Sequence, residues 1–94
     1  MITIELAFFA TLQKEFGEIN TIVIEEPMEF RQILDLFYSK DDQIGSSFFL
    51  ENEELKKGFI VLINGRNILA LEGLNTHINQ NCEVSFFPII AGGL

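Results

Sequence analysis

The fold of this protein is decided by the stretch EVSFFPIIAGG, residues 83–93. Its first five residues alternate like a strand, with Val84 and Phe86 on one face and Ser85 and Phe87 on the other. Pro88 has no backbone N–H and is unsuited to a central sheet ladder, so we expect the chain to leave the folded body there. The sequence therefore predicts a domain over residues 1–87 and a flexible tail over residues 88–94.

The expected tail has a composition suited to insertion into another protein. Ile89, Ile90 and Ala91 are apolar but too few to form another element, and Gly92 and Gly93 carry no side chains. Glycine lets a backbone approach a partner closely and adopt conformations that other residues avoid. We therefore predict that the folded body presents this tail to a partner.

The N-terminal part predicts a hairpin and a helix. Residues 2–9 alternate with a period of two, which predicts a strand with its even positions toward the core. A short helix or turn ended by Gly17 leads to a β-rich run over residues 19–25, and the two strands are expected to pair antiparallel. Residues 26–29 are typical of a helix start. The apolar face of this helix consists of Phe30, Ile33, Leu34 and Phe37.

The second half predicts a further hairpin. Residues 47–57 favour a short helix, and residues 59–63 are an unbroken apolar run typical of a strand. Asn64-Gly65 is a strong turn signal that predicts a return strand over residues 66–69. Residues 71–78 are expected to form a packed crossing loop before the last strand.

These elements predict an α+β fold of the β-grasp, ubiquitin-like class. A hairpin, a crossing helix and a return strand give a mixed sheet of four to five strands with one main helix packed across one face. The first and last strands then pair in parallel at the centre, which places Phe9 beside Phe87 on the face opposite the helix. Two interpretations stay open: an exposed docking surface, or cover by Phe48, Phe49 or Leu74.

Composition and charge argue against several classes of function. Fourteen acidic and six scattered basic residues give a net charge of -8, so nucleic acid is not an expected partner. The acidic surface either steers the chain toward basic proteins or maintains its solubility. The longest apolar run is far shorter than the ~18 residues of a membrane span, and no signal peptide is evident, so we expect a cytoplasmic protein without membrane contact.

The reactive side chains predict no metal site and no nucleophile in this chain. Cys82 opens the last strand, and nothing near it indicates a lowered thiol pKa, so we expect a small packing residue. His77 has no metal-ligand spacing to the cysteine or to a second histidine.

Three segments give the chain a family resemblance: FFA at residues 8–10, LINGR at residues 62–66 and EVSFFPIIAGG at residues 83–93. With them the chain resembles the MoaD/ThiS family of ubiquitin-like sulfur carriers, above all the small subunit of molybdopterin synthase. It is more loosely similar to the archaeal ubiquitin-like small modifiers. The resemblance spans the whole chain, and its specificity lies in the Phe-Phe-Pro strand end that leads to the glycine pair.

The resemblance implies a sulfur carrier rather than an enzyme. A MoeB-like activating enzyme would use ATP to adenylate the carboxylate of Gly93, and a sulfur donor would convert it to a thiocarboxylate. The tail would then enter a MoaE-like large subunit, which would hold the catalytic residues and receive the sulfur for the dithiolene of molybdopterin. Gly92 would pass a narrow channel, and no cofactor would bind this chain. The partner contacts would come from Phe9, Phe87, Pro88, Ile89, Ile90 and Ala91.

Leu94 departs from the family pattern, in which the glycine pair ends the chain. Either a peptidase removes Leu94, or the chain is not a working carrier as written. Three alternatives therefore stay open beside the molybdopterin carrier. They are a protein modifier joined through Gly93 to lysines, a ThiS-like carrier for thiamine synthesis, and a noncovalent β-grasp binding module.

Overall fold

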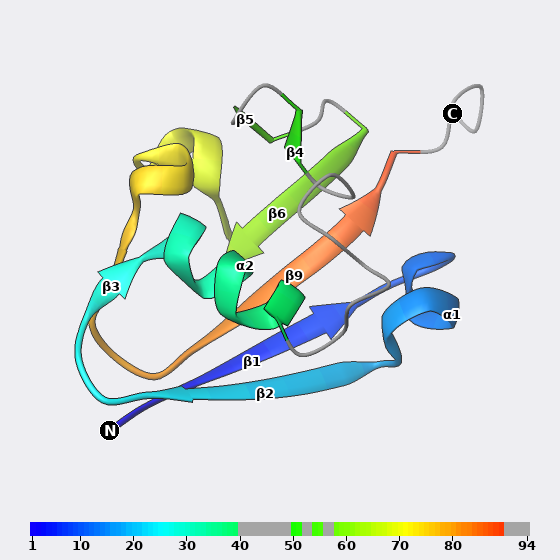
Figure 1. Ribbon diagram of the computed structural model, residues 1–94. Coiled ribbons are helices and arrows are strands. Elements are labelled where there is room, and N and C mark those ends of the chain that lie inside the picture. The colour runs from blue at the N-terminus through cyan, green and yellow to red at the C-terminus, as the bar shows by residue number, and fades with distance from the viewer. Residues whose placement is uncertain (40–49, 52–53, 56–57, 90–94) are drawn as a thin grey trace.

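Two parallel strands form the centre of the sheet in the computed structural model, which describes residues 1–39, 50–51, 54–55 and 58–89 (Figure 1). These strands are β1, Ile2–Phe8, and β9, Cys82–Pro88. The strand order of the five-stranded sheet is β2-β1-β9-β6-β7. This order confirms the predicted mixed sheet and β-grasp arrangement. The antiparallel strands are β2 (Ile19–Ile24), β6 (Phe59–Ile63) and β7 (Arg66–Asn67).

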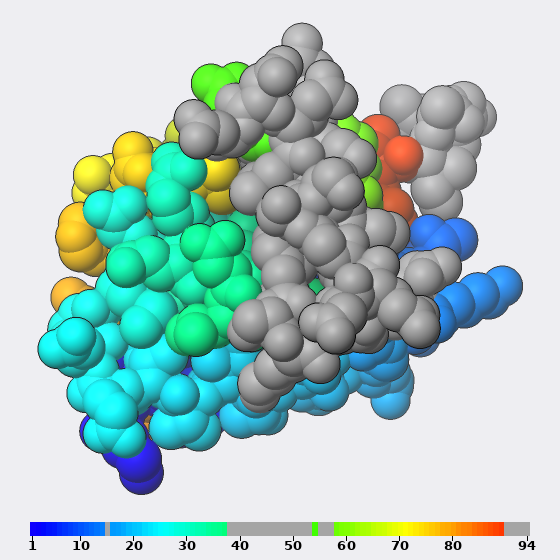
Figure 2. Space-filling model, in the orientation of Figure 1, coloured from blue at the N-terminus to red at the C-terminus, as the bar shows by residue number. Residues whose placement is uncertain are grey.

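The core lies between this sheet and α2, Phe30–Ser39. Alternation along β1 turns its even positions toward the helix, where Ile4 and Leu6 are fully buried. Figure 2 views this covered side, where the cyan and green surface of α2 lies beside the yellow surface of residues 68–75. No helix in the described part of the chain is long and apolar enough to cross a membrane. The predicted helix face is buried against the sheet and consists of Phe30, Ile33, Leu34 and Phe37.

Two turns with left-handed backbone join the strands as predicted. Gly17 ends α1, Leu12–Phe16, with a φ of 80°, and the chain then enters β2. Asn64 and Gly65 have φ values of 50° and 84°. Positive φ at both positions is the requirement of a two-residue hairpin loop of type I′, so the Asn-Gly signal identified the turn between β6 and β7 correctly.

The main helix begins later than predicted. Residues Met28–Glu29, part of the helix start expected at residues 26–29, form β3 and pair with β8, His77–Ile78. The helix follows directly, and its first turn is capped because Gln32 Oε1 accepts a hydrogen bond of 2.9 Å from the N–H of Glu29. Local helix-start signals failed here because a strand distant in the sequence pairs with these two residues.

The short helix predicted over residues 47–57 is contradicted by its described part. β4, Leu50–Glu51, pairs antiparallel with β5, Glu54–Leu55, and Leu50 lies opposite Leu55. So few apolar residues do not distinguish the period of a helix from that of a strand. The other residues of that predicted helix lie outside the described part of the chain.

The return strand predicted over residues 66–69 is shorter than expected. Asn67 ends it, because its Oδ1 accepts a hydrogen bond of 2.9 Å from the N–H of Leu69. The chain continues as a 3-10 segment, Ile68–Ala70, and a second such segment, Gly73–Asn75, lies within the predicted crossing loop.

Candidate functional site

Phe9 and Phe87 form an aromatic pair on the face of the sheet opposite α2. Their ring centroids lie 4.4 Å apart at an interplanar angle of 11°, which is a stacked arrangement. The N–H of Phe9 donates to the Phe86 carbonyl at 3.1 Å, and its carbonyl accepts from the Leu12 N–H at 3.2 Å. Phe9 keeps 37% of its surface exposed, and Phe87 is half-buried. The predicted juxtaposition of the two rings is confirmed.

β9 continues past the point at which the sequence predicts its end. Pro88 is still paired with β6, and the N–H of Ile89 donates to the Gly58 carbonyl at 2.8 Å. Backbone groups alternate in direction along a strand, so the nitrogen of Pro88 faces the opposite side, toward β1. The ladder between β1 and β9 ends before that point, so the missing N–H removes no ladder bond. The folded body therefore includes two residues beyond the predicted domain of residues 1–87.

The end of β9 is where the chain leads toward the glycine pair. Ile89 is the last described residue, and half of its surface is exposed. Figure 1 shows the end of β9 at the same end of the sheet as α1, next to the segment that follows β1. Gly92 comes three residues after Ile89, within about 11 Å of chain. The predicted tail residues that lie outside the described part of the chain are Ile90, Ala91, Gly92, Gly93 and Leu94.

We call the side of the sheet opposite α2 the open face, and it is apolar at the end that carries the aromatic pair. Ile60 of β6 lies opposite Phe87, and Ile19 of β2 lies opposite Ala7 of β1. Ile60 and Ile19 are both exposed. Apolar side chains that are exposed on neighbouring strands form the kind of patch that marks a protein–protein contact.

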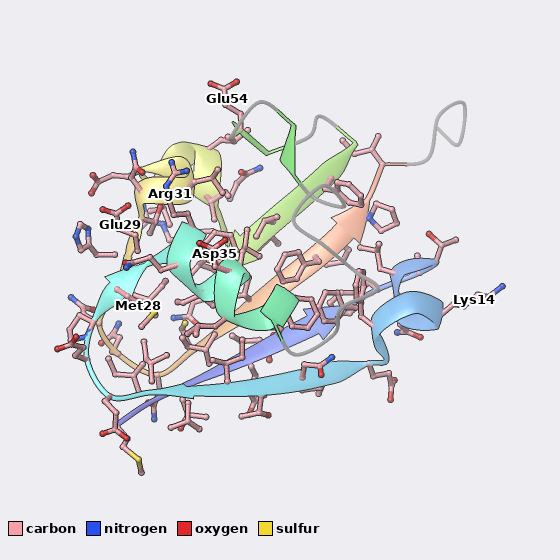
Figure 3. The ribbon with its side chains drawn as sticks, viewed as in Figure 1. Lys14, Met28, Glu29, Arg31, Asp35 and Glu54 are labelled. Carbon is pink, nitrogen blue, oxygen red and sulfur yellow. The ribbon has the colours of Figure 1, made fainter. Side chains whose placement is uncertain are left out.

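The open face is acidic toward its other end. Glu5 of β1 lies opposite Glu83 of β9, and both side chains are exposed. Asn64 holds this end in place, because its N–H donates to the Glu83 carbonyl at 2.8 Å and its Oδ1 accepts from the Glu83 N–H at 2.9 Å. Neither carboxylate forms a salt bridge within the described residues; the ion pair of Arg31 with Glu29, at 3.8 Å, lies on the helix side (Figure 3).

One of the predicted covers for the aromatic pair is wrong. Leu74 is buried in the core between the sheet and α2, so it lies on the other side of the sheet. Phe48 and Phe49 lie outside the described residues, and cover by either of them stays a prediction.

Cys82 and His77 lie away from the end of β9. Cys82 begins that strand, whereas the tail follows its other end. Burial raises the pKa of the Cys82 thiol, so the thiol is protonated at neutral pH. His77 is exposed in β8. In the part of the chain that the structure describes, no three side chains of His, Cys, Asp or Glu gather to hold a metal ion.

Sequence reasoning missed the acidic pair, although its signal was present. Alternation along β1 places Glu5 on the same face as Phe9, and alternation along β9 places Glu83 on the same face as Phe87. The parallel register that aligns the two rings therefore also aligns the two carboxylates.

Comparisons with known proteins identify relatives of the chain. The model of the ThiS family matches residues 6–93. Small archaeal modifier protein 3 of Haloferax volcanii is 30% identical over 91 residues, which are 96% of this chain and 98% of that protein. The solution structure of small archaeal modifier protein 1 from Methanosarcina acetivorans has a TM-score of 0.76 at 26% identity, over 99% of this chain and 98% of that one. A chain of the Amycolatopsis orientalis BexX/CysO complex shares the fold, with a TM-score of 0.76 at 19% identity, over 96% and 99% of the two chains.

Proposed function

The chain belongs to the ThiS family, and from this premise we propose that it is a sulfur carrier activated at Gly93. Its relatives are ubiquitin-like small modifiers and sulfur carriers, whose β-grasp fold it shares. The proposed partner in activation is an adenylating enzyme of the MoeB kind, which binds ATP and supplies the catalytic groups. This chain then acts as the carrier and not as the enzyme.

Activation at Gly93 requires the free carboxylate of that residue. A carboxylate oxygen attacks the α-phosphorus of ATP, pyrophosphate leaves, and an acyl-adenylate forms. Sulfide supplied by a donor then attacks the acyl carbon, AMP leaves, and the product is a thiocarboxylate. Leu94 follows Gly93 in this sequence, so a peptidase first hydrolyses the bond between them.

The observation that carries the proposal is the position of the aromatic pair. Phe9 and Phe87 stack at the end of the sheet from which the chain leads to the glycines. The hydrogen bond from Ile89 to Gly58 keeps the chain in the sheet up to that residue, so the tail starts from a defined point. A partner that binds the two rings would therefore receive the glycine pair close to its contact surface, which is the positioning that acyl chemistry requires.

For the sulfur acceptor we propose the dithiolene of molybdopterin. In this version the tail enters a large subunit of the MoaE kind, and that subunit carries out the sulfur transfer. The support is the Phe-Phe-Pro strand end at residues 86–88, which leads to the glycine pair and on which the resemblance to MoaD-like chains rests.

A second candidate function is the modification of proteins through Gly93. The observation that favours it is the 30% identity to small archaeal modifier protein 3, over nearly the full length of both chains. Both candidates share the acyl-adenylate and differ in the group that attacks it. Sulfur attacks in a carrier, and a lysine amine of another protein attacks in a modifier.

The test uses the chain ended at Gly93, the adenylating enzyme of the source organism, ATP and a sulfur donor. We expect an intact mass in which sulfur replaces one oxygen of Gly93. The chain that retains Leu94 is the control, and without a peptidase it should keep its mass. Addition of the MoaE-like subunit then distinguishes the two candidate functions. Transfer of the sulfur to a molybdopterin precursor supports the molybdopterin carrier. Conjugates with other proteins that survive denaturation support the protein modifier. An unchanged mass for the chain ended at Gly93 contradicts the proposal.

A further inference from the structure

The pairing of Glu5 with Glu83 is unfavourable for the free protein. The two residues are direct neighbours on the two central strands, which lie about 5 Å apart in any β-sheet. Like charges on neighbouring positions of a sheet destabilise it. No salt bridge within the described residues relieves this repulsion. A cation from another molecule, bound between the two carboxylates, would relieve it.

The open face gives this acidic pair a fixed position relative to the aromatic pair. Glu83 and Phe87 are four residues apart on β9 and point to the same side, which places them about 13 Å apart along the strand. The hydrogen bonds of Asn64 hold the backbone of Glu83, and Asn81 Oδ1 accepts from the Thr3 N–H at 2.8 Å at the same end. The carboxylates are therefore presented from rigid strands.

Among the described residues, no basic side chain on the open face of a second copy could supply this cation. The basic side chains that the structure describes are Lys14, Arg31 and Arg66. Lys14 lies on α1 and Arg31 on α2, whereas Arg66 lies opposite the core residue Ile63. All three are thus on the helix side or at the edge of the sheet. The described residues therefore favour a different protein, with its own basic side chain, as the occupant.

We propose that Glu5 and Glu83 together receive an arginine or lysine side chain of the adenylating partner, while the aromatic pair enters an apolar site of the same partner. The inference rests on the proposed function and deepens it, because it states the chemistry of the partner surface. Two carboxylates on adjacent strands match the forked donors of a guanidinium. Two contacts of different chemistry at opposite ends of one face fix the direction in which the carrier docks. Only one direction brings the end of β9 to the partner's active site.

The experiment measures ATP–pyrophosphate exchange by the source organism's adenylating enzyme, with the chain ended at Gly93 as substrate. The test variant is Glu5→Gln/Glu83→Gln. The control is Asp35→Asn/Glu72→Gln, which removes the same charge from two exposed residues off the open face. Figure 3 labels Asp35, on α2. We expect the KM of the test variant to rise about tenfold with kcat unchanged, because the contact acts in docking. High salt should shrink the difference, since exposed charges are screened. The control should keep the wild-type KM.

The melting temperature of each variant shows whether a raised KM comes from loss of the fold or from loss of the docking contact. Removal of the repulsion should raise the Tm of the test variant by about 2 °C. A raised KM together with a lowered Tm overturns the inference, as does a wild-type KM, or an equal rise in the control. No exchange with the unaltered chain ended at Gly93 contradicts the proposed function itself, and the inference falls with it.

Discussion

Two stacked phenylalanine pairs lie at adjacent positions of the same two strands and differ in what covers them. Phe8 and Phe86 stack with centroids 4.9 Å apart on the helix side, where both are buried. Phe9 and Phe87 stack at 4.4 Å on the open face, where Phe9 keeps over a third of its surface exposed. The same residue type and almost the same geometry thus appear once inside the core and once on the surface. The difference separates rings that hold the fold from rings that we propose to contact a partner.

The buried pair, Phe8 and Phe86, should contribute more to the free energy of unfolding than the exposed pair. Phe86→Ala is expected to lower the free energy of unfolding by about 3 to 5 kcal/mol, because it leaves a cavity beside Phe8 and Phe30. Phe87→Ala is the matched control on the open face and should cost about 1 kcal/mol, since its ring is half-buried. Urea denaturation of both variants measures the difference. Equal losses in the two variants would show that the buried and the exposed pair contribute alike to stability.

On β6, next to β9, a buried and an exposed residue should differ in the same way, with smaller effects on stability. Val61 lies opposite Phe86 and is buried, whereas Ile60 lies opposite Phe87 and is exposed. Val61→Ala should reduce the free energy of unfolding by about 2 kcal/mol, and Ile60→Ala by less than about 1 kcal/mol. The KM for the adenylating enzyme should show the reverse order, with the larger rise for Ile60→Ala. A larger rise for Val61→Ala would remove Ile60 from the docking surface.

A double-mutant cycle on the aromatic pair, Phe9 and Phe87, tests whether the two rings bind the partner together. Phe87→Ala should weaken partner binding by about 1 kcal/mol or more if the ring is a hot spot. Phe9→Ala and the double variant complete the cycle, and we expect a coupling of about 1 kcal/mol because each ring supports the other. Calorimetric titration with the adenylating enzyme measures all four binding constants. Strict additivity would show that the rings do not act as a unit.

The smallest effect belongs to the start of β9, at Cys82. Burial raises the pKa of this thiol above the ordinary value of 9.0. Between the unfolded and the folded pKa the folded state binds more protons, so the free energy of unfolding should fall as the pH rises above about 9. Cys82→Ala should lose this part of the pH dependence, and denaturation at several alkaline pH values measures it. An identical slope in the variant would exclude the thiol as its source.

Local patterns predicted most of the sheet and of the aromatic pair. The alternation in β1 and β9 assigned the faces of Phe8, Phe9, Phe86 and Phe87 correctly, because side-chain direction in a strand depends only on the neighbouring residues. The Asn-Gly turn was equally readable, since its positive φ values follow from local sterics. The role of the glycine pair came from the family resemblance and stays a prediction.

Pairings between distant segments were the part that local patterns missed. Met28–Glu29 carry helix-start signals, yet they pair with His77–Ile78. Pro88 has no N–H and was expected to end the strand, yet its nitrogen faces the side on which the ladder has already stopped. In both places a partner strand, and not the residue's own propensity, determined the outcome.

Local sequence is enough to assign which side chains share a face, where the tight turn lies and where the glycine pair stands in the chain. Each of these depends on bond geometry over a few residues. The tertiary structure added the parallel register of β1 and β9, which sets how closely Phe9 stacks on Phe87 and which aligns Glu5 with Glu83. Those contacts join the first strand to the last. Their register depends on how the helix and the intervening strands pack into one core, because no local rule aligns two strands so far apart in the chain.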